Sequence, residues 1–229
     1  MHGHVIPINT PLPLSSPIRS RGTAGTQTGY TGRVLAKGEH LYHAGDSIAG
    51  PYMVITGALK GYNTDEDGFE RVMRLYSTGD VLGFEGLARR GAVSSIVAVD
   101  TAKVWKMTEQ GPVEGGPGML GITETILMGF YRELSLSAQV LEMNRGSAQA
   151  RLARFLVHYG DQQAQRGCKE QEFLLPFGRR DLAHYLGIAA ETLSRAFGSL
   201  RKKHILKMNE NHIVVLDPAD LRRIANGNA

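Results

Sequence analysis

The sequence predicts an α+β protein with an N-terminal β jelly roll, a long helix and a C-terminal winged helix-turn-helix domain. Short apolar runs between glycines predict the jelly roll, and an apolar stripe at helical spacing predicts the long helix. Two short helical patterns that meet at a glycine, followed by a hairpin pattern, predict the last domain. We expect a tail at 1–29, the jelly roll at 30–118, the long helix at 119–145 and the C-terminal domain at 146–229.

The amino-acid composition limits the classes to which the protein can belong. The chain has 229 residues, of which 42% are hydrophobic, and a formal net charge of +4. That charge permits nucleic-acid binding without proving it. Cys168 is the only cysteine, which excludes an intrachain disulfide and an all-cysteine zinc or iron–sulfur site. No apolar run reaches the length of a membrane span, so we expect a cytoplasmic protein with no membrane partner.

The tail at 1–29 is rich in proline, serine, threonine and glycine, and no acidic residue precedes Glu39. Such a segment buries too little apolar surface to offset the entropy of ordering it. The sequence therefore predicts a disordered tail and gives no role for it.

Glycines punctuate the next segment between short apolar runs, which recur about every 8–12 residues as in β sandwiches and barrels. Two similar turn dipeptides, Gly45-Asp46 and Gly79-Asp80, occupy corresponding places. A closed jelly roll of about eight strands accounts for this pattern. The clearest apolar runs are residues 33–35, 52–55, 71–75, 95–99 and 102–107.

An apolar stripe runs through 119–145 for about seven helical turns, which is longer than a small barrel can cover. A parallel seam with the same helix of a second copy is the simplest way to bury it, because two-fold dimers are the commonest oligomers. The alternative is a helix that packs only on its own barrel. The residues expected in the dimer interface are Ile122, Ile126, Phe130, Leu134 and Leu141.

The C-terminal domain begins where this stripe is broken. Gly146 is the expected hinge, and Ser147 is placed to cap a helix over 148–165. A short strand is expected at 173–176.

A helix, a tight turn and a second helix follow within 178–197. Gly187 occupies the turn, where a left-handed residue ends a helix without a Cβ penalty. Apolar residues then recur at helical spacing as far as Leu200. A hairpin at 205–216, with its turn at 209–211, is typical of a wing, and a final short helix begins after it.

The polar face of the second helix carries Glu191, Thr192, Ser194 and Arg195. Short donors and acceptors beside one guanidinium are the groups that read base edges in a major groove. The window 178–207 is basic, with seven arginines and lysines against two acidic residues. These features predict that the domain binds double-stranded DNA.

Five motifs occur in a fixed order along the chain, at 38–46, 79–87, 151–153, 181–187 and 191–195. Together they resemble the CRP/FNR superfamily of bacterial transcription regulators over about 34–226, and most of all its FNR/FixK-like branch. The resemblance implies a homodimer in which Glu191, Ser194 and Arg195 read the half-sites of a TTGA-type palindrome. It also implies RNA polymerase as a partner, with the acidic turn at 65–68 as the loop that could touch it.

Two positions lack the polar side chain that the resemblance leads us to expect. Ala189 replaces the serine or threonine that caps the second helix, and Gly178 replaces a polar residue at the start of the first. Gly178 keeps only its backbone N–H for a phosphate. We therefore expect basic residues to supply more of the grip on the DNA backbone. The expected phosphate contacts are Gly178, Arg179, Arg180, Thr192, Arg201 and Lys202.

The sensing domain departs further from the family. Cyclic-nucleotide binders have a glutamate after the glycine of the pocket helix and an Arg-Ser pair on the next strand, whereas this chain has Phe84 and the pair Val-Ser at 93–94. A cyclic phosphate would lack its charge partner. The tail also lacks the cysteines of an iron–sulfur cluster. We expect a regulator with no cofactor and no metal, and not an enzyme.

Two alternatives remain open at this point. One is a regulator of the same fold that depends on haem or another small molecule. The other is a cupin-like metal enzyme, for which only His40 and His43 lie in the barrel region. Cys168 lies between Arg166 and Lys169, whose charges could lower its pKa and make it a redox switch; the alternative is an inert loop thiol.

Overall fold

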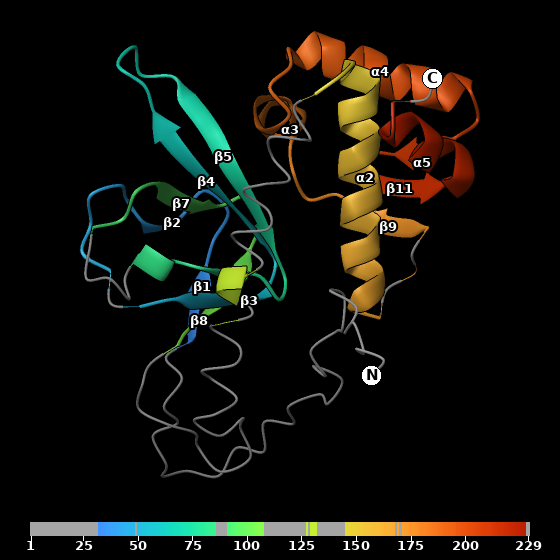
Figure 1. The fold of residues 1–229 in the computed structure, drawn as a ribbon. Coiled ribbons are helices and arrows are strands. Elements are labelled where there is room, and N and C mark those ends of the chain that lie inside the picture. Colours follow the sequence, from blue (N-terminus) through green and yellow to red (C-terminus); the bar gives the residue numbers. More distant parts are fainter. Residues whose placement is uncertain are drawn as a thin grey trace, which may run out of the picture.

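The computed structural model describes residues 32–48, 50–85, 91–107, 127, 129–131, 145–167, 169 and 171–227. Within them a β sandwich precedes a domain of four helices and a small sheet (Figure 1). This order confirms the predicted α+β class.

The sandwich consists of two four-stranded antiparallel sheets, in the orders β1-β8-β3-β6 and β2-β7-β4-β5. Leu35, Leu59, Leu82 and Ile96 point between the sheets and are at most 1% exposed. All five apolar runs form strands, and three further strands complete the sandwich. The strands are β1 (Gly32–Leu35), β2 (His40–Tyr42), β3 (Tyr52–Thr56), β4 (Ala58–Thr64), β5 (Glu70–Ser77), β6 (Val81–Leu82), β7 (Ser95–Ala98) and β8 (Ala102–Lys106).

The turn between β3 and β4 depends on Gly57, whose φ is +85°. A Cβ at this position would lie 2.2 Å from the carbonyl oxygen of Thr101. Both the conformation and the close approach therefore require glycine. At the dipeptide Gly79-Asp80, a carboxylate oxygen of Asp80 accepts a hydrogen bond of 2.7 Å from the backbone N–H of Ser77, which closes the turn before β6.

The first helix after the sandwich begins at the predicted cap. Ser147 Oγ accepts a hydrogen bond of 3.2 Å from the N–H of Ala150, and α2 has the predicted bounds. Gly187 has a φ of +62° in the turn between α3 and α4. The small sheet has the order β10-β11-β9. The elements are α2 (Ala148–Gln165), β9 (Glu172–Leu174), α3 (Arg179–Tyr185), α4 (Ala190–Lys202), β10 (Leu206–Asn209), β11 (His212–Val215) and α5 (Pro218–Ala225).

The strands β10 and β11, with the loop that joins them, form the wing. Asn209 pairs with His212, so the loop contains only Glu210 and Asn211 and is shorter than the predicted turn at 209–211. Glu210 takes a left-handed conformation, with a φ of +51°. The hairpin prediction is confirmed, but its turn is one residue shorter because pairing extends to Asn209.

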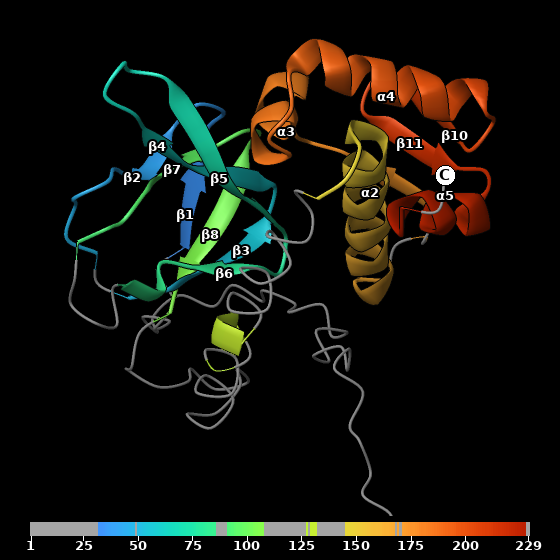
Figure 2. The same ribbon diagram turned by 45° about the horizontal axis from the view of Figure 1, so that its top comes forward.

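The two domains contact each other through apolar side chains and through two ion pairs. Ala58, Leu75 and Val99 of the sandwich pack with the hydrophobic core of the C-terminal domain. Lys60 Nζ lies 2.9 Å from a carboxylate oxygen of Asp181 on α3, and Arg166, at the end of α2, lies 3.0 Å from Asp80. The ribbon places α3 between β5 and α4 in both views (Figures 1 and 2).

Candidate nucleic-acid interface

Helix α4 is amphipathic, and its two faces have different surroundings. Leu193, Ala196, Phe197 and Leu200 are buried in the core of the domain. The predicted base-reading residues Glu191, Ser194 and Arg195 are all exposed on the other face. The structure therefore brings the three together within the first two turns of one helix, where they can reach a ligand without any rearrangement of the core.

The two charged base-reading residues are paired with each other. Arg195 Nη2 donates to Glu191 Oε1, and the side chains are 73% and 76% exposed. An ion pair this exposed contributes about 0–1 kcal/mol, so a base edge can displace it at little cost. Ser194 Oγ donates a hydrogen bond of 3.0 Å to the carbonyl oxygen of Ala190, which holds the hydroxyl on the helix surface.

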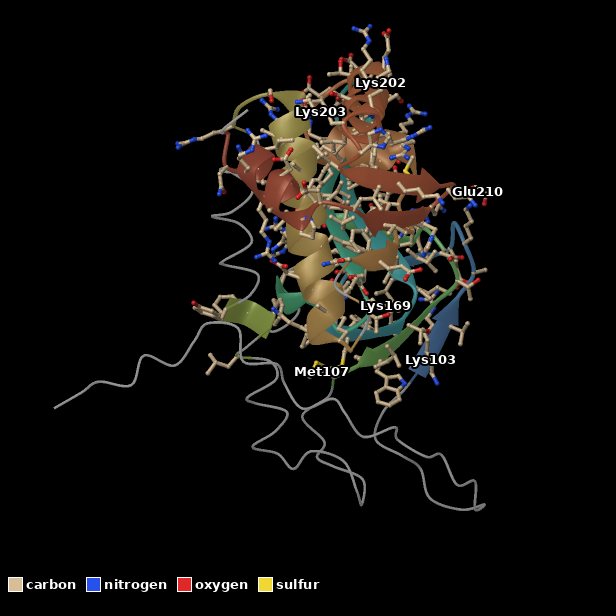
Figure 3. The ribbon with its side chains drawn as sticks, turned by 90° about the vertical axis from the view of Figure 1, so that its right-hand side faces the viewer. Lys103, Met107, Lys169, Lys202, Lys203 and Glu210 are labelled. Carbon is tan, nitrogen blue, oxygen red and sulfur yellow. The ribbon has the colours of Figure 1, made fainter. Side chains whose placement is uncertain are left out.

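The predicted phosphate contacts fall into two groups. Gly178, Arg180, Thr192, Arg201 and Lys202 are exposed. Figure 3 shows Lys202 and Lys203 at the end of α4 and Glu210 at the tip of the wing. No side chain caps α3 or α4 at its N-terminus, so Gly178 and Ala189 leave the first N–H groups of both helices without a side-chain acceptor.

Arg179 belongs to the second group because its guanidinium is directed into the domain. Its Cζ lies 3.7 Å from the ring centroid of Phe197, and Nη2 donates to the sulfur of Met208. Burial lowers the pKa of Arg179. This placement argues against the predicted phosphate contact and shows a packing role that the sequence alone did not reveal.

Arg151 is a second residue whose role became visible only in the structure. Its Nη1 donates hydrogen bonds of 3.3 Å to the carbonyl oxygens of Leu186 and Gly187. These are carbonyls at the end of α3 and in the turn that leads to α4, which have no partner within the helix. Arg151 thus ties the turn to α2. The motif at 151–153 singled the residue out without indicating this task.

Most of the residues predicted for the dimer seam lie outside the described residues: Ile122, Ile126, Leu134 and Leu141. Phe130 is described, is 46% exposed and makes an edge contact with Phe84 at a centroid distance of 5.8 Å. Its neighbours Leu127 and Tyr131 are 64% and 46% exposed. Cys168 also lies outside the described residues, so its redox role stays a prediction.

The histidines of the barrel stack on each other, with ring centroids 4.2 Å apart. His40 Nε2 lies 2.9 Å from the hydroxyl of Tyr62. Burial, together with the nearby His43, lowers the pKa of His40 and favours its neutral form. Within the described ranges, the structure has no cluster of three or more histidine, cysteine or acidic residues that could hold a metal ion.

Comparison with known proteins agrees with this geometry. Residues 32–111 match the family described as cyclic nucleotide-binding domain, and residues 150–224 match the Crp-like helix-turn-helix domain. The fumarate and nitrate reduction regulatory protein of Vibrio cholerae is 29% identical over 192 residues, which cover 83% of this chain and 77% of that protein. The transcriptional activator protein Anr of Pseudomonas protegens is 27% identical over 197 residues, or 86% and 81% of the two chains.

Among solved structures, FixK2 from Bradyrhizobium japonicum has the same fold, with a TM-score of 0.70 and 23% identity over 85% of this chain and 96% of that one. In the part of the chain that is described, no helix is both long enough and apolar enough to span a bilayer. The two domain matches, their order and the relatives agree on one assignment. The chain belongs to the CRP/FNR family of transcription regulators, with a cyclic nucleotide-binding domain followed by a Crp-like helix-turn-helix domain.

Proposed function

We propose that this protein is a homodimeric transcription regulator that reads a TTGA-type palindrome through Glu191, Ser194 and Arg195, and that it requires neither cyclic AMP nor an iron–sulfur cluster. The observation that carries the proposal is the exposed polar face of α4, which presents these three side chains opposite a buried apolar face.

The chemistry of the three side chains fits the proposed half-site. Arg195 can donate two hydrogen bonds to O6 and N7 of a guanine, and Glu191 can accept one from N4 of the paired cytosine. Ser194 can contact a thymine. Because Arg195 and Glu191 are four residues apart on one helix face, they can address the two bases of one pair in the half-site.

The proposed grip on the DNA backbone comes from the exposed residues around α4. Arg201 and Lys202 lie in its last turn, and Arg180 and Thr192 lie in the first turns of α3 and α4. Each cation that meets a phosphate releases condensed counterions and strengthens binding irrespective of sequence. Gly178 offers only its backbone N–H to a phosphate.

The proposed dimer forms through the segment at 119–145. Leu127, Phe130 and Tyr131 carry apolar surface that their own chain leaves exposed, which supports a partner helix on this side. A two-fold axis along that helix pair would present two copies of α4 about 34 Å apart, one turn of DNA.

The packed interior of the β sandwich supports a regulator that does not require cyclic AMP. Leu35, Leu59, Leu82 and Ile96 occupy the space between the sheets. Val93 is 71% exposed and carries no charge for a cyclic phosphate.

RNA polymerase is the proposed protein partner, through the turn between β4 and β5. The N–H of Phe69 donates a hydrogen bond of 2.9 Å to Asp65, which shapes the acidic turn, and the Phe69 side chain is 65% exposed. An aromatic ring beside carboxylates is a common anchor in protein interfaces.

The test is fluorescence anisotropy with full-length protein purified without added ligand, on a TTGA palindrome, on one half-site and on random DNA. Arg195→Ala should cost about 1–3 kcal/mol on the palindrome and little on random DNA, since base readout is lost while the phosphate contacts remain. Arg71→Ala, which removes one exposed charge from the barrel, is the matched control. Equal losses on both DNAs contradict base reading, and equal affinity for half-site and palindrome contradicts the dimer.

A further inference from the structure

Arg179 joins three elements that together form the DNA-binding surface. It is the first residue of α3, and its guanidinium stacks on Phe197 of α4 with Cζ 3.7 Å from the ring centroid. The same group donates through Nη2 to Met208 on β10 of the wing. Phe197 is only 3% exposed, so the stack lies against the core rather than on the outer surface.

Keeping a charged guanidinium in this partly buried position costs desolvation free energy. Within the described residues no carboxylate lies within ion-pair distance of Arg179, so its partial burial is compensated mainly by the ring and the sulfur. Desolvated cations cost free energy unless they are paired, and a leucine or methionine would fill such a gap without that cost. The neighbouring Arg180 is exposed. The two arginines therefore have different surroundings despite their adjacency in the sequence.

The planar guanidinium stacks on an aromatic ring and donates in its own plane at the same time, which an ammonium cannot do. The stack links α3 to Phe197 of α4, and the hydrogen bond to Met208 links the same side chain to the wing. Glu191 lies six residues from Phe197, about 9 Å along the helix axis. A tilt of about 6° at Phe197 would displace the base-reading end of α4 by about 1 Å, which exceeds the tolerance of a preorganised site.

We propose that Arg179 is a positioning residue that fixes the angle between the recognition helix α4 and the wing, and that it does not bind a phosphate. The inference rests on the proposed function, since the angle matters for base reading. Arg179 thus contributes to sequence specificity although it contacts no base.

The first test separates positioning from phosphate binding by salt dependence. Arg179→Met and Arg179→Lys are compared with Arg180→Met and Arg180→Lys on a TTGA palindrome and on random DNA. Loss of a phosphate contact lowers the slope of log K against log salt by about 0.9, and lysine largely restores it. We expect that behaviour for Arg180.

For Arg179 we expect a different pattern. Both substitutions should weaken binding to the palindrome by about threefold to thirtyfold, the range of a cation–π contact, with the slope and the binding to random DNA unchanged. Arg179→Lys should fail to rescue because it keeps the charge without the stack. A slope reduced in Arg179→Met and restored in Arg179→Lys would overturn the proposal.

Hydrogen exchange of the wing gives a second readout that needs no DNA. We expect Arg179→Met to increase exchange of the β10 and β11 amides and Arg180→Met to leave it unchanged. Adding Arg179→Met to Phe197→Leu should have little further effect on wing exchange, because Phe197→Leu has already removed the stack. If the wild type fails to discriminate the palindrome, the proposed function fails, whereas wing protection still decides the role of Arg179. Unchanged hydrogen exchange of the β10 and β11 amides in both Arg179→Met and Arg179→Lys would overturn the positioning role of Arg179.

Discussion

The interdomain ion pair between Lys60 and Asp181 gives a prediction whose magnitude follows from its surroundings. The side chains are 14% and 21% exposed, and Lys60 also bonds Glu70 at 2.8 Å. Burial opposes the charge on Lys60, but hydrogen bonds to Glu70 and Asp181 outweigh it and raise its pKa. Asp181→Asn keeps an acceptor for Lys60 and leaves Glu70 in place, so we expect a loss of about 1–2 kcal/mol in domain docking. Lys60→Met removes the partner of both carboxylates and should cost about 2–3 kcal/mol.

The chain contains its own probes for this experiment. Trp105, the only tryptophan, lies on β8 and reports the barrel by fluorescence. Hydrogen exchange of the amides in α2 to α5 reports the C-terminal domain. In urea, the two signals should coincide for the wild type and separate for Lys60→Met, with Asp181→Asn between them. Lys37→Met, at an exposed lysine of the sandwich, is the control. Coincident transitions in Lys60→Met, at the wild-type midpoint, would refute the reasoning.

Two further predictions concern protonation and capping. Burial lowers the pKa of His158 from its ordinary 6.5, so the folded state binds fewer protons than the unfolded state just below pH 6.5. The free energy of unfolding should therefore be constant above about pH 7 and fall as the pH decreases through the range in which histidine titrates. Urea unfolding at several pH values should show a smaller decrease for His158→Gln than for the wild type. Ala189→Ser places a side-chain cap at an extended residue before α4. It should raise the free energy of unfolding by about 1 kcal/mol and tighten DNA binding. An unchanged urea unfolding midpoint would contradict the formation of the cap.

The sequence predicted well those features that local chemistry decides. Ser147 and the following apolar pattern defined α2 to the residue, and Gly187 marked the turn because only a left-handed residue fits there. Strand β4 was harder to recognise, since Lys60, Gly61 and Asn63 dilute its apolar character. It is a strand because β5 and β7 pair with it on both sides.

The contacts between distant segments could not be predicted. Arg179 and Arg180 are both cations next to each other in the sequence, but they differ by about 100° around the helix. Which of them faces inward depends on where β10 places Met208, 29 residues further along. In the same way, nothing in the sequence relates Lys60 to Asp181, 121 residues apart. The outward face of α4 was predicted correctly because the apolar period fixes it locally.

The ion pair between Glu191 and Arg195 has a consequence for how the regulator finds its site in a genome. A protein that slides along DNA is held by phosphates, and every cation directed at them strengthens its hold on irrelevant sequence. On the proposed function, Glu191 offsets the charge of Arg195 on the same helix, so the pair would add little attraction while the protein scans, and Arg180, Arg201 and Lys202 would set the residence time. At the proposed half-site, a guanine and its cytosine would offer new partners to both side chains together, which favours separation of the pair. If the proposed function holds, non-specific sliding and sequence-specific binding depend on different side chains.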